Sequence, residues 1–151
     1  MPTVLLIGAS RGIGLELARQ YRADGWRVMA TARSAEALAQ LQALGCEALR
    51  LDVAEPASNS GLAWQLDGEK LDLAVYVAGA MDRANAPQPP TREAFDAVMH
   101  ANVMGAMQVI PQSAPMVQET QGVIACISSV MGSLQETSSG NAALYRVSKA
   151  A

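Results

Sequence analysis

The stretch that most constrains this chain lies near its N-terminus, where a short apolar run passes through a glycine-rich loop into a helical pattern. Residues 4–7 read as a buried strand, and apolar residues recur at helical spacing from Ile13 onward. Gly8, Gly12 and Gly14 stand in and just after the loop; the first allows a tight turn, the second a close approach of backbone to a pyrophosphate, and the third close helix packing. Glycines at this spacing also recur by chance, so the strand before them and the helix after them carry the prediction of a phosphate-binding loop.

Alternating strand and helix patterns continue after this loop and predict the fold class. Strands are expected at residues 27–32, 47–51, 71–77 and 123–128, and helices at 12–23, 35–44, 56–66, from 93 onward and over the last residues. This alternation predicts an α/β protein with a doubly wound parallel sheet, a Rossmann fold, covered by helices on both faces. We treat residues 1–151 as one domain, because a chain of this length holds one sizeable core. Residues 81–92 are proline-rich and aperiodic, and we expect a surface loop there that forms a substrate rim.

A long uncharged stretch, residues 97–118, follows the predicted loop. The polar residues and prolines inside it argue against a membrane span; they are Asn102, Gln108, Pro111, Gln112 and Pro115. A helix without charge on any side is expected to be buried on more than one side, here against the sheet and, as a hypothesis, against a partner subunit. We expect Pro111 to kink it.

Charge, cysteines and histidine exclude several classes of function. The net charge of −3 gives no broad basic surface for a nucleic acid. Cys46 and Cys126 fit no metal-ligand spacing and are expected to be buried free thiols. His100 is the only histidine and no Gly-x-Ser-x-Gly motif is present, so neither a metal site nor a hydrolase triad is favoured. Residues 1–3 lead straight into the first strand without a signal-like segment, so a cytoplasmic protein is expected.

A tyrosine and a lysine lie one helical turn apart near the end of the chain. Tyr145 and Lys149 are spaced i, i+4, so they share one face of a helix. An ammonium beside a phenol stabilises the phenolate and makes the phenol a better proton donor near neutral pH. A surface tyrosine and lysine on consecutive turns are also frequent, so the pair alone is weak evidence.

Together with the glycine loop, this pair makes the sequence resemble the short-chain dehydrogenase/reductase family. The matching motifs follow the family's order along the chain: Gly8-x-x-x-Gly12-x-Gly14 in the cofactor loop, Asp52-Val53 near the adenine ring, Ala78-Gly79 at the end of an Asn-Asn-Ala-Gly signature, Asn102-Val-x-Gly105 in a helix, Ile127-Ser128-Ser129 in the active-site strand and Tyr145-x-x-x-Lys149. The longer spacing from Ser129 to Tyr145 is similar to that of the carbonyl-reductase and C-factor-like branch. The chain stops at Ala151, where the family continues, so we expect either a fragment or further residues, and a truncated sheet with exposed apolar surface.

The resemblance implies a role for each matching residue in hydride transfer to a carbonyl compound. Tyr145 would be the general acid, Ser129 would hold the carbonyl oxygen, and Lys149 would bind the nicotinamide ribose and acidify the tyrosine. Asn102 would anchor a water chain that resupplies the proton. Two alternatives stay open: Asn102 as a residue that satisfies backbone groups at a helix break, and Ser128 as the acting serine.

The residue after the second strand bears on the choice of cofactor. NAD-dependent enzymes usually place an acid there to bind the ribose 2′-hydroxyl, whereas this chain has Ala32 followed by Arg33. Arg33 and Arg11, with Ser10, could instead pair with a 2′-phosphate, which favours NADP(H) over NAD(H). A solvated arginine at a helix entry is the alternative for Arg33. Ile13 completes the predicted cofactor-binding residues.

One departure from the family and two alternative functions remain. Tyr76-Val77 stands where the family has Asn-Asn, so we expect apolar packing there instead of polar support. The main hypothesis is an NADPH-dependent reductase of small carbonyl compounds, working as a homodimer or homotetramer. A dinucleotide-sensing or signalling protein with little turnover, as in C-factor-like relatives, is the second hypothesis, and an inactive structural subunit is the third.

Overall fold

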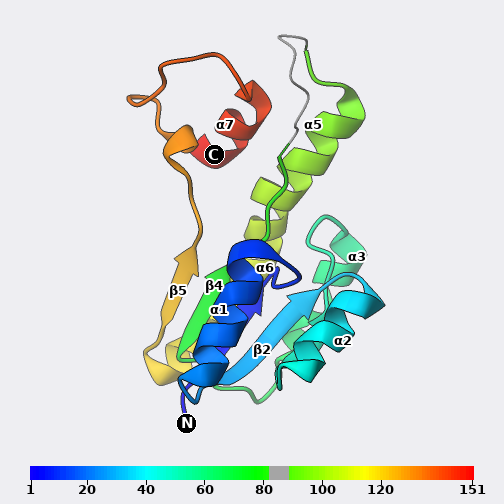
Figure 1. Cartoon of the computed structure of the whole chain (residues 1–151), viewed down its shortest axis with the longest axis vertical. Coiled ribbons are helices and arrows are strands. Elements are labelled where there is room, and N and C mark those ends of the chain that lie inside the picture. The colour runs from blue at the N-terminus through cyan, green and yellow to red at the C-terminus, as the bar shows by residue number, and fades with distance from the viewer. Residues whose placement is uncertain (82–88) are drawn as a thin grey trace.

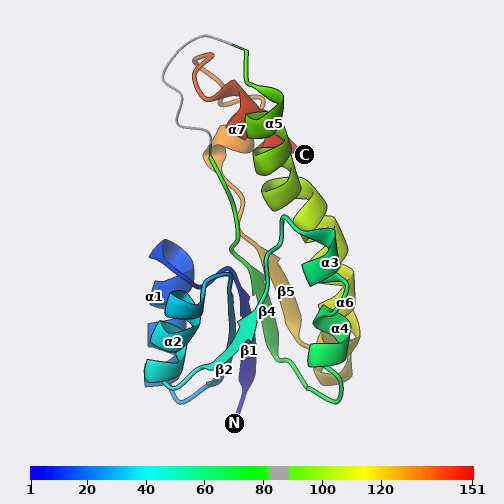
Figure 2. The same ribbon diagram turned by 90° about the vertical axis from the view of Figure 1, so that its right-hand side faces the viewer.

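The computed structural model describes residues 1–81 and 89–151 and shows a parallel sheet between two layers of helices (Figures 1 and 2). The strands are β1 Thr3–Ile7, β2 Arg27–Ala32, β3 Glu47–Arg50, β4 Leu73–Tyr76 and β5 Val123–Cys126. They pair in parallel in the order β3-β2-β1-β4-β5. The predicted doubly wound α/β fold is confirmed, with the strand order reversing direction between β1 and β4.

The helices divide between the two faces of the sheet and a group beyond its carboxyl end. Figure 2 shows α1 (Gly12–Ala23) and α2 (Ala35–Ala43) on one face, and α3 (Pro56–Asn59), α4 (Leu62–Gln65) and α6 (Gly105–Thr120) on the other. A π-helix, η1 (His100–Met104), joins α5 (Arg92–Met99) to α6. The 3₁₀ turn η2 (Val130–Gly132) and α7 (Ala143–Ala150) lie beyond the arrowheads of β4 and β5 (Figure 1).

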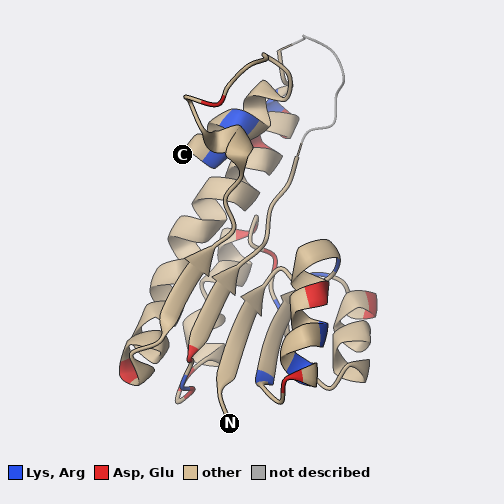
Figure 3. Ribbon diagram, turned by 60° about the vertical axis from the view of Figure 1, so that its left-hand side comes forward, with Lys and Arg blue, Asp and Glu red and all other residues tan. Residues whose placement is uncertain are grey.

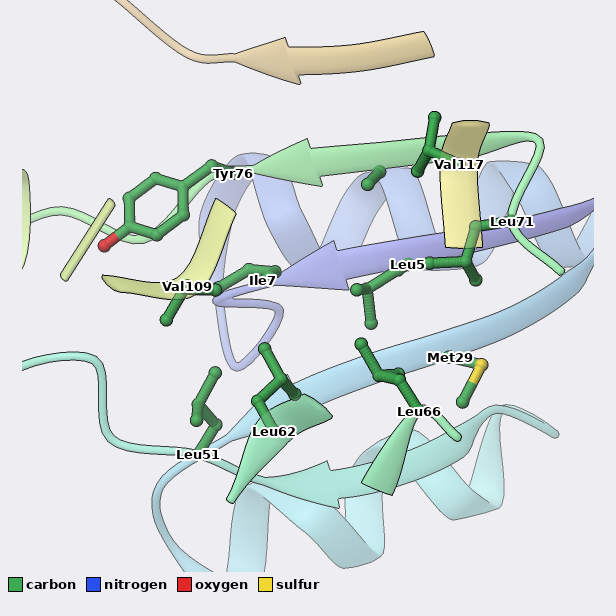
Figure 4. Close-up of a cluster of buried hydrophobic side chains, with 11 residues drawn as sticks. Leu5, Ile7, Met29, Leu51, Leu62, Leu66, Leu71, Tyr76, Val109 and Val117 are labelled. Atoms are coloured by element: carbon green, nitrogen blue, oxygen red, sulfur yellow. The ribbon is translucent and has the colours of Figure 1, made fainter. Parts of the chain in front are cut away.

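The central strand β1 supplies both halves of the hydrophobic core. All five of its residues are buried, and successive side chains point to opposite faces of the sheet. Leu5 and Ile7 join a cluster with Leu62 of α4 and Val109 of α6 (Figure 4), whereas Leu6 packs in the cluster under α1 and α2. Burying a leucine of this kind stabilises the fold by about 2 kcal/mol.

Two predicted features differ in the structure, and a third falls largely outside the described residues. The helix expected over residues 56–66 is split into α3 and α4 at Ser60–Gly61, because the Asn59 side chain bonds to Val53 O and Gln108 and a glycine follows. Cys46 is buried as expected, but Cys126 is exposed, because β5 is an edge strand whose ends are open to solvent. The predicted loop at 81–92 falls largely on residues 82–88, which lie outside the described residues.

The uncharged stretch, residues 97–118, forms the end of α5, all of η1 and most of α6, which together with the start of α5 make a long helical rod (Figure 3). Val109, Ser113 and Val117 of α6 are buried against the sheet side of the molecule. The rod leaves α geometry at η1, and α6 then continues through both internal prolines, so the kink expected at Pro111 stays a prediction. Within the described ranges, none of the helices has the length and apolar run needed to cross a membrane.

Candidate active site

The glycine loop packs against the chain that leaves β4, and its shape excludes side chains at two of its three glycines. Gly8 has φ +92°, and a Cβ there would lie 2.7 Å from the Ala78 backbone. A Cβ on Gly14 would lie 2.1 Å from Gly8 O. Gly12 has φ +56°, but a Cβ built there would meet no atom within 4 Å, so its backbone faces open space. The loop therefore leaves bare backbone exposed at the N-terminus of α1, as a phosphate cradle requires.

The other predicted cofactor-binding residues of this loop lie at the surface. Ser10, Arg11 and Ile13 are exposed, and the Arg11 side chain does not cap α1. Arg33 is exposed directly after β2, and the next residue, Ser34, caps α2 by accepting a hydrogen bond from Ala37 N–H at 3.2 Å. Neither arginine forms an ion pair with a carboxylate of the described residues.

The turn after β3 carries the predicted adenine-contacting pair. Asp52 Oδ1 accepts a hydrogen bond from Ala54 N–H at 3.1 Å, and Asp52 N–H donates to Ser58 Oγ at 2.9 Å. The carbonyl of Val53 accepts from Asn59 Nδ2 at 2.9 Å. Because Asn59 is 1% exposed and also donates to Gln108 Oε1 at 2.8 Å, this turn is tied to α6 from inside the protein.

The segment after β4 brings the glycine loop and the later motifs together. Both Val77 N–H and Ala78 N–H donate to Ile7 O, at 2.9 and 2.8 Å. A Cβ built on Gly79 would lie 3.3 Å from Asn102 Oδ1 and 3.8 Å from Lys149 Nζ. Gly79 therefore lies where the side chains of Asn102 and Lys149 approach each other, and a Cβ there would press on the Asn102 amide and touch the Lys149 ammonium.

Asn102 of η1 connects this segment to α7 through every hydrogen-bonding group of its amide. Its Oδ1 accepts from Ala80 N–H at 2.7 Å, and its Nδ2 donates to Ala80 O and to Ser148 Oγ, each at 2.8 Å. Ser148 Oγ in turn donates to Tyr145 O at 2.7 Å. Asn102 thus satisfies the backbone of Ala80, in the loop after β4, and links η1 to the helix that carries Tyr145. Its role at the helix break and its role in a water chain both stay predictions.

Tyr145 and Lys149 lie on one side of α7, as their spacing predicts. Lys149 Nζ is 5.8 Å from the centre of the Tyr145 ring and donates to Ile127 O at 3.0 Å. Burial lowers the pKa of Lys149, because the charged form loses solvation. The ammonium is thus held between the end of β5 and the face of α7 that carries the phenol.

The two candidate serines follow β5 and differ in their surroundings. Ser129 is half-buried and its Oγ accepts from Met131 N–H at 3.1 Å, which caps η2, whereas Ser128 is exposed. η2 rests directly on α7, since a Cβ on Gly132 would lie 2.6 Å from Lys149 O. Ser129 is therefore anchored to the same body as Tyr145, and Ser128 is not held in this way.

Sequence reasoning missed two contributors to this arrangement. The ring of Tyr76 packs in the apolar core as expected, but its hydroxyl also donates to Ala101 O at 2.7 Å, so the expected lack of polar support was wrong. The expectation failed because a phenol offers an apolar ring and a donor together. Ser148 gave no signal, because the Tyr-x-x-x-Lys pattern leaves the residue at its position unspecified.

An apolar hollow of about 350 Å³ lies between the chain after η2 and α7. It faces Ala143, Arg146 and Val147, on the opposite side of α7 from Tyr145 and Lys149. Of the residues discussed for chemistry, none lines this hollow. We therefore do not assign the substrate to it.

Comparisons with known proteins agree with this geometry. Residues 2–151 match the family model described as short chain dehydrogenase. Serine 3-dehydrogenase of Rhizobium radiobacter is 34% identical over 85% of this chain and 53% of its own length. NADPH-dependent pterin aldehyde reductase of Arabidopsis thaliana is 33% identical over 86% of this chain and 57% of its own length, so the chain spans little more than half of these relatives. A solved short-chain dehydrogenase/reductase of Burkholderia multivorans with bound NADP is 32% identical and aligns with TM-score 0.86 over 99% of this chain and 68% of that one.

Proposed function

Because the chain belongs to the short-chain dehydrogenase family, we propose that it is part of an NADPH-dependent oxidoreductase that transfers hydride between the cofactor and a small carbonyl or alcohol substrate. One observation carries the proposal. The side chains of Asn102 from η1 and Lys149 from α7 meet at Gly79, beyond the carboxyl end of β4 and next to the glycine loop, and the Tyr145 ring lies beside Lys149. Ligands of doubly wound sheets bind at this edge, where the strand order reverses.

The residues of the cradle fit the phosphates of a dinucleotide. A Cβ on Gly8 or Gly14 would collide with backbone, and the space beside Gly12 is free of protein atoms within 4 Å of a Cβ built there. The bound cofactor would supply or accept the hydride, and the protein would supply orientation and charge stabilisation. We assign the pyrophosphate to the glycine loop and Ile13, and the adenine end to Asp52 and Val53.

Proton transfer falls to the residues of α7 and their neighbours. We assign Tyr145 as the general acid in the reductive direction and Ser129 as the residue that binds the carbonyl oxygen. We assign Lys149 to stabilising the phenolate and binding the nicotinamide ribose. We assign Asn102 to holding the Ala80 backbone and anchoring the water chain that resupplies the proton. Ala78 and Gly79 line the cofactor side.

The charge beside β2 supports NADP(H) over NAD(H). No carboxylate follows the strand, since Ala32 and Arg33 occupy that position. Arg33 and Arg11 are exposed and form no ion pair with carboxylates of the described residues, and Ser10, which precedes Arg11, is exposed too, so all three are available to a 2′-phosphate. Two relatives are named for NADP or NADPH, which supports the same choice.

The alternative function is a dinucleotide sensor with little turnover, and the third candidate is an inactive structural subunit. The linkage from Asn102 through Ser148 to the Tyr145 backbone favours an enzyme, because nucleotide binding alone does not require it. We further propose a cytoplasmic homodimer or homotetramer that binds no nucleic acid and no membrane. The exposed Met104 and Met107 on the η1–α6 rod support contact with a second subunit.

The test is NADPH oxidation by the protein with a panel of aldehydes and ketones. Tyr145→Phe should lower kcat by about 10²- to 10⁴-fold, because the general acid is lost. A variant that kept its activity would show that another group donates the proton. If the wild-type protein binds NADPH but oxidises none of the panel, the sensor becomes the better assignment.

The cofactor preference is tested by comparing NADPH and NADH binding to wild type and to an Arg33 variant. Arg33→Ala should weaken NADPH binding much more than NADH binding, because only NADPH carries the 2′-phosphate. The exposed Arg19 of α1, which pairs with Glu16, gives a matched control, since Arg19→Ala removes the same charge elsewhere on the surface. If Arg33→Ala lost affinity for NADPH and NADH equally, Arg33 would not bind the 2′-phosphate.

A further inference from the structure

We propose that Tyr76 is a positioning residue that holds the π-helix η1 in the register that aims Asn102 at Ala80 and α7. The inference rests on the proposed function for its catalytic consequence, and on the hydrogen bonds of η1 for its structural part. Tyr76 is the last residue of β4, and neither the cofactor loop nor the Tyr145–Lys149 pair contacts it in the described hydrogen bonds.

The hydroxyl of Tyr76 is a well-defined donor. The residue is 5% exposed, and its ring packs with Ile7 and Val109 in the core, with the oxygen at the outer end of the cluster (Figure 4). It donates to Ala101 O at 2.7 Å. Burial raises the pKa of Tyr76, so the phenol keeps its proton and remains a donor throughout the working pH range.

The bond enters a segment whose geometry needs support. In η1 the Gly105 N–H donates to His100 O, five residues back, instead of four as in an α-helix. Such wide turns are rare within helices because an ordinary α register competes with them. The Tyr76 bond to a carbonyl inside the wide turn favours the observed register over the α alternative.

Gly105 provides the space that this bond requires. A Cβ on Gly105 would lie 2.7 Å from the Tyr76 hydroxyl oxygen and 2.6 Å from Val53 O. Its φ of −59° is ordinary for a helix, so glycine is needed here for close approach and not for backbone conformation. The hydroxyl, the wide turn and Gly105 therefore form one fitted contact between β4 and the start of α6.

Asn102 directly follows the carbonyl that Tyr76 holds. One residue of register turns a helical side chain by about 100°, so the register of η1 decides whether the amide can reach Ala80 and Ser148. Asn102 makes three bonds to those two residues, and Ser148 continues to the Tyr145 backbone. Tyr76 thus acts on the candidate active site through Asn102, without touching the reacting atoms.

The experiment is Tyr76→Phe, which removes the hydroxyl and keeps the ring. We expect kcat to fall about five- to tenfold, the worth of one lost hydrogen bond of about 1 kcal/mol. The KM for NADPH should stay within about twofold of wild type, since the phosphate cradle is not involved. Tyr21→Phe, on the other face of the sheet beside Trp26, is the matched control and should leave kcat unchanged.

A double-mutant cycle separates positioning from general support of the fold. If Tyr76 acts through Asn102, then Tyr76→Phe will have little further effect on kcat in an Asn102→Ala background. If the fold-loss of kcat in the double variant equals the product of the losses in the two single variants, the proposal is overturned. A second variant, Gly105→Ala, should displace the hydroxyl and give the same non-additivity if Tyr76→Phe proves too unstable to assay.

Hydrogen exchange tests the structural part without any turnover. The Ala80 N–H is bonded to Asn102 Oδ1, so its exchange should speed up about tenfold in Tyr76→Phe and stay unchanged in Tyr21→Phe. Unchanged exchange of Ala80 in Tyr76→Phe would overturn the proposal even in an active enzyme. If the protein proves inactive but Ala80 responds, the proposed function fails and the positioning role stands.

Discussion

The half of the molecule from β1 to β3 and the half that follows β3 are built by different means. The first half is shaped by apolar packing under α1 and α2 and by glycines in the loop after β1. The second half depends on buried or half-buried polar side chains that reach across the chain, which are Tyr76, Asn59, Asn102, Gln108, Gln112 and Ser148. The candidate phosphate cradle thus depends mainly on backbone, whereas the proposed proton-transfer site depends on side chains held by other side chains.

The strongest way to break this comparison is to put a side chain into the cradle. Gly14→Ala should destabilise the protein by more than about 4 kcal/mol or prevent folding, because its Cβ would lie 2.1 Å from Gly8 O, a backbone atom that cannot yield cheaply. Gly12→Ala should cost only about 1 kcal/mol, since the left-handed φ is its one obstacle. Chemical denaturation of both variants measures the difference.

Similar losses in the two variants would mean that the loop can shift as a unit. The first half would then be no more rigid than the second, and the comparison would fail. NADPH binding to the Gly12→Ala variant adds a second measurement, because a methyl group there would stand where backbone is expected to meet the pyrophosphate.

The second test removes a polar connection from the other half. Asn59→Ala should lower the free energy of unfolding by about 1–3 kcal/mol, because Val53 O and Gln108 Oε1 both lose a buried donor. The neighbouring exposed Ser60, which bonds only locally to Ala57 O among the described contacts, is the control; Ser60→Ala should change stability by less than about 0.5 kcal/mol. A thermal melt in which the two variants match would show that this polar network contributes little.

The smallest effect is expected at the amino end of the sheet, where Arg27 of β2 pairs with Glu47 and Glu69. The hydrogen bond from Arg27 lowers the pKa of Glu69 below its ordinary value of 4.5. Because the pKa is lower in the folded state, the Glu69 carboxylate stabilises the fold at pH values above its ordinary pKa. This stabilisation is lost as the pH falls through the pKa that Glu69 has in the folded protein. Glu69→Gln should therefore cost about 1 kcal/mol at pH 7 and progressively less below about pH 4.

Urea titrations of wild type and Glu69→Gln at several pH values measure this dependence. Glu36→Gln on the exposed first turn of α2 is a suitable control for the loss of one negative charge. A stability difference that did not change with pH would show that Glu69 supports the fold through packing and not through its charge.

Features that depend on neighbouring residues in sequence were predictable, and those that depend on distant ones were not. The apolar run at 4–7 and the glycines after it define β1, its turn and α1 by local spacing, and the structure confirms them. The π-turn η1 has no local signature, because it depends on a hydroxyl from Tyr76 that is 25 positions from Ala101. The exposure of Cys126 also escaped prediction, because apolar neighbours along the chain do not show whether a strand lies at an edge.

The candidate site divides in the same way. The positions of Tyr145 and Lys149 on one side of α7 follow from helical spacing alone. Ser148 was missed although it lies between them, because its role comes from Asn102, 46 positions away. The roles of these residues in catalysis remain predictions that the assays above test.

The residue that precedes α7 shows how the direction of that helix is maintained. Ala142 has φ +52° and ψ +40°, a left-handed conformation that residues with a Cβ avoid by about 1 kcal/mol. The turn before α7 is therefore locally unfavourable. We infer that α7 keeps its direction through its contacts with η1, by the bond from Asn102 to Ser148, and with η2, by the packing of Gly132 on Lys149 O. Loosening those attachments would let the turn relax toward an ordinary conformation and carry the phenol of Tyr145 away with it.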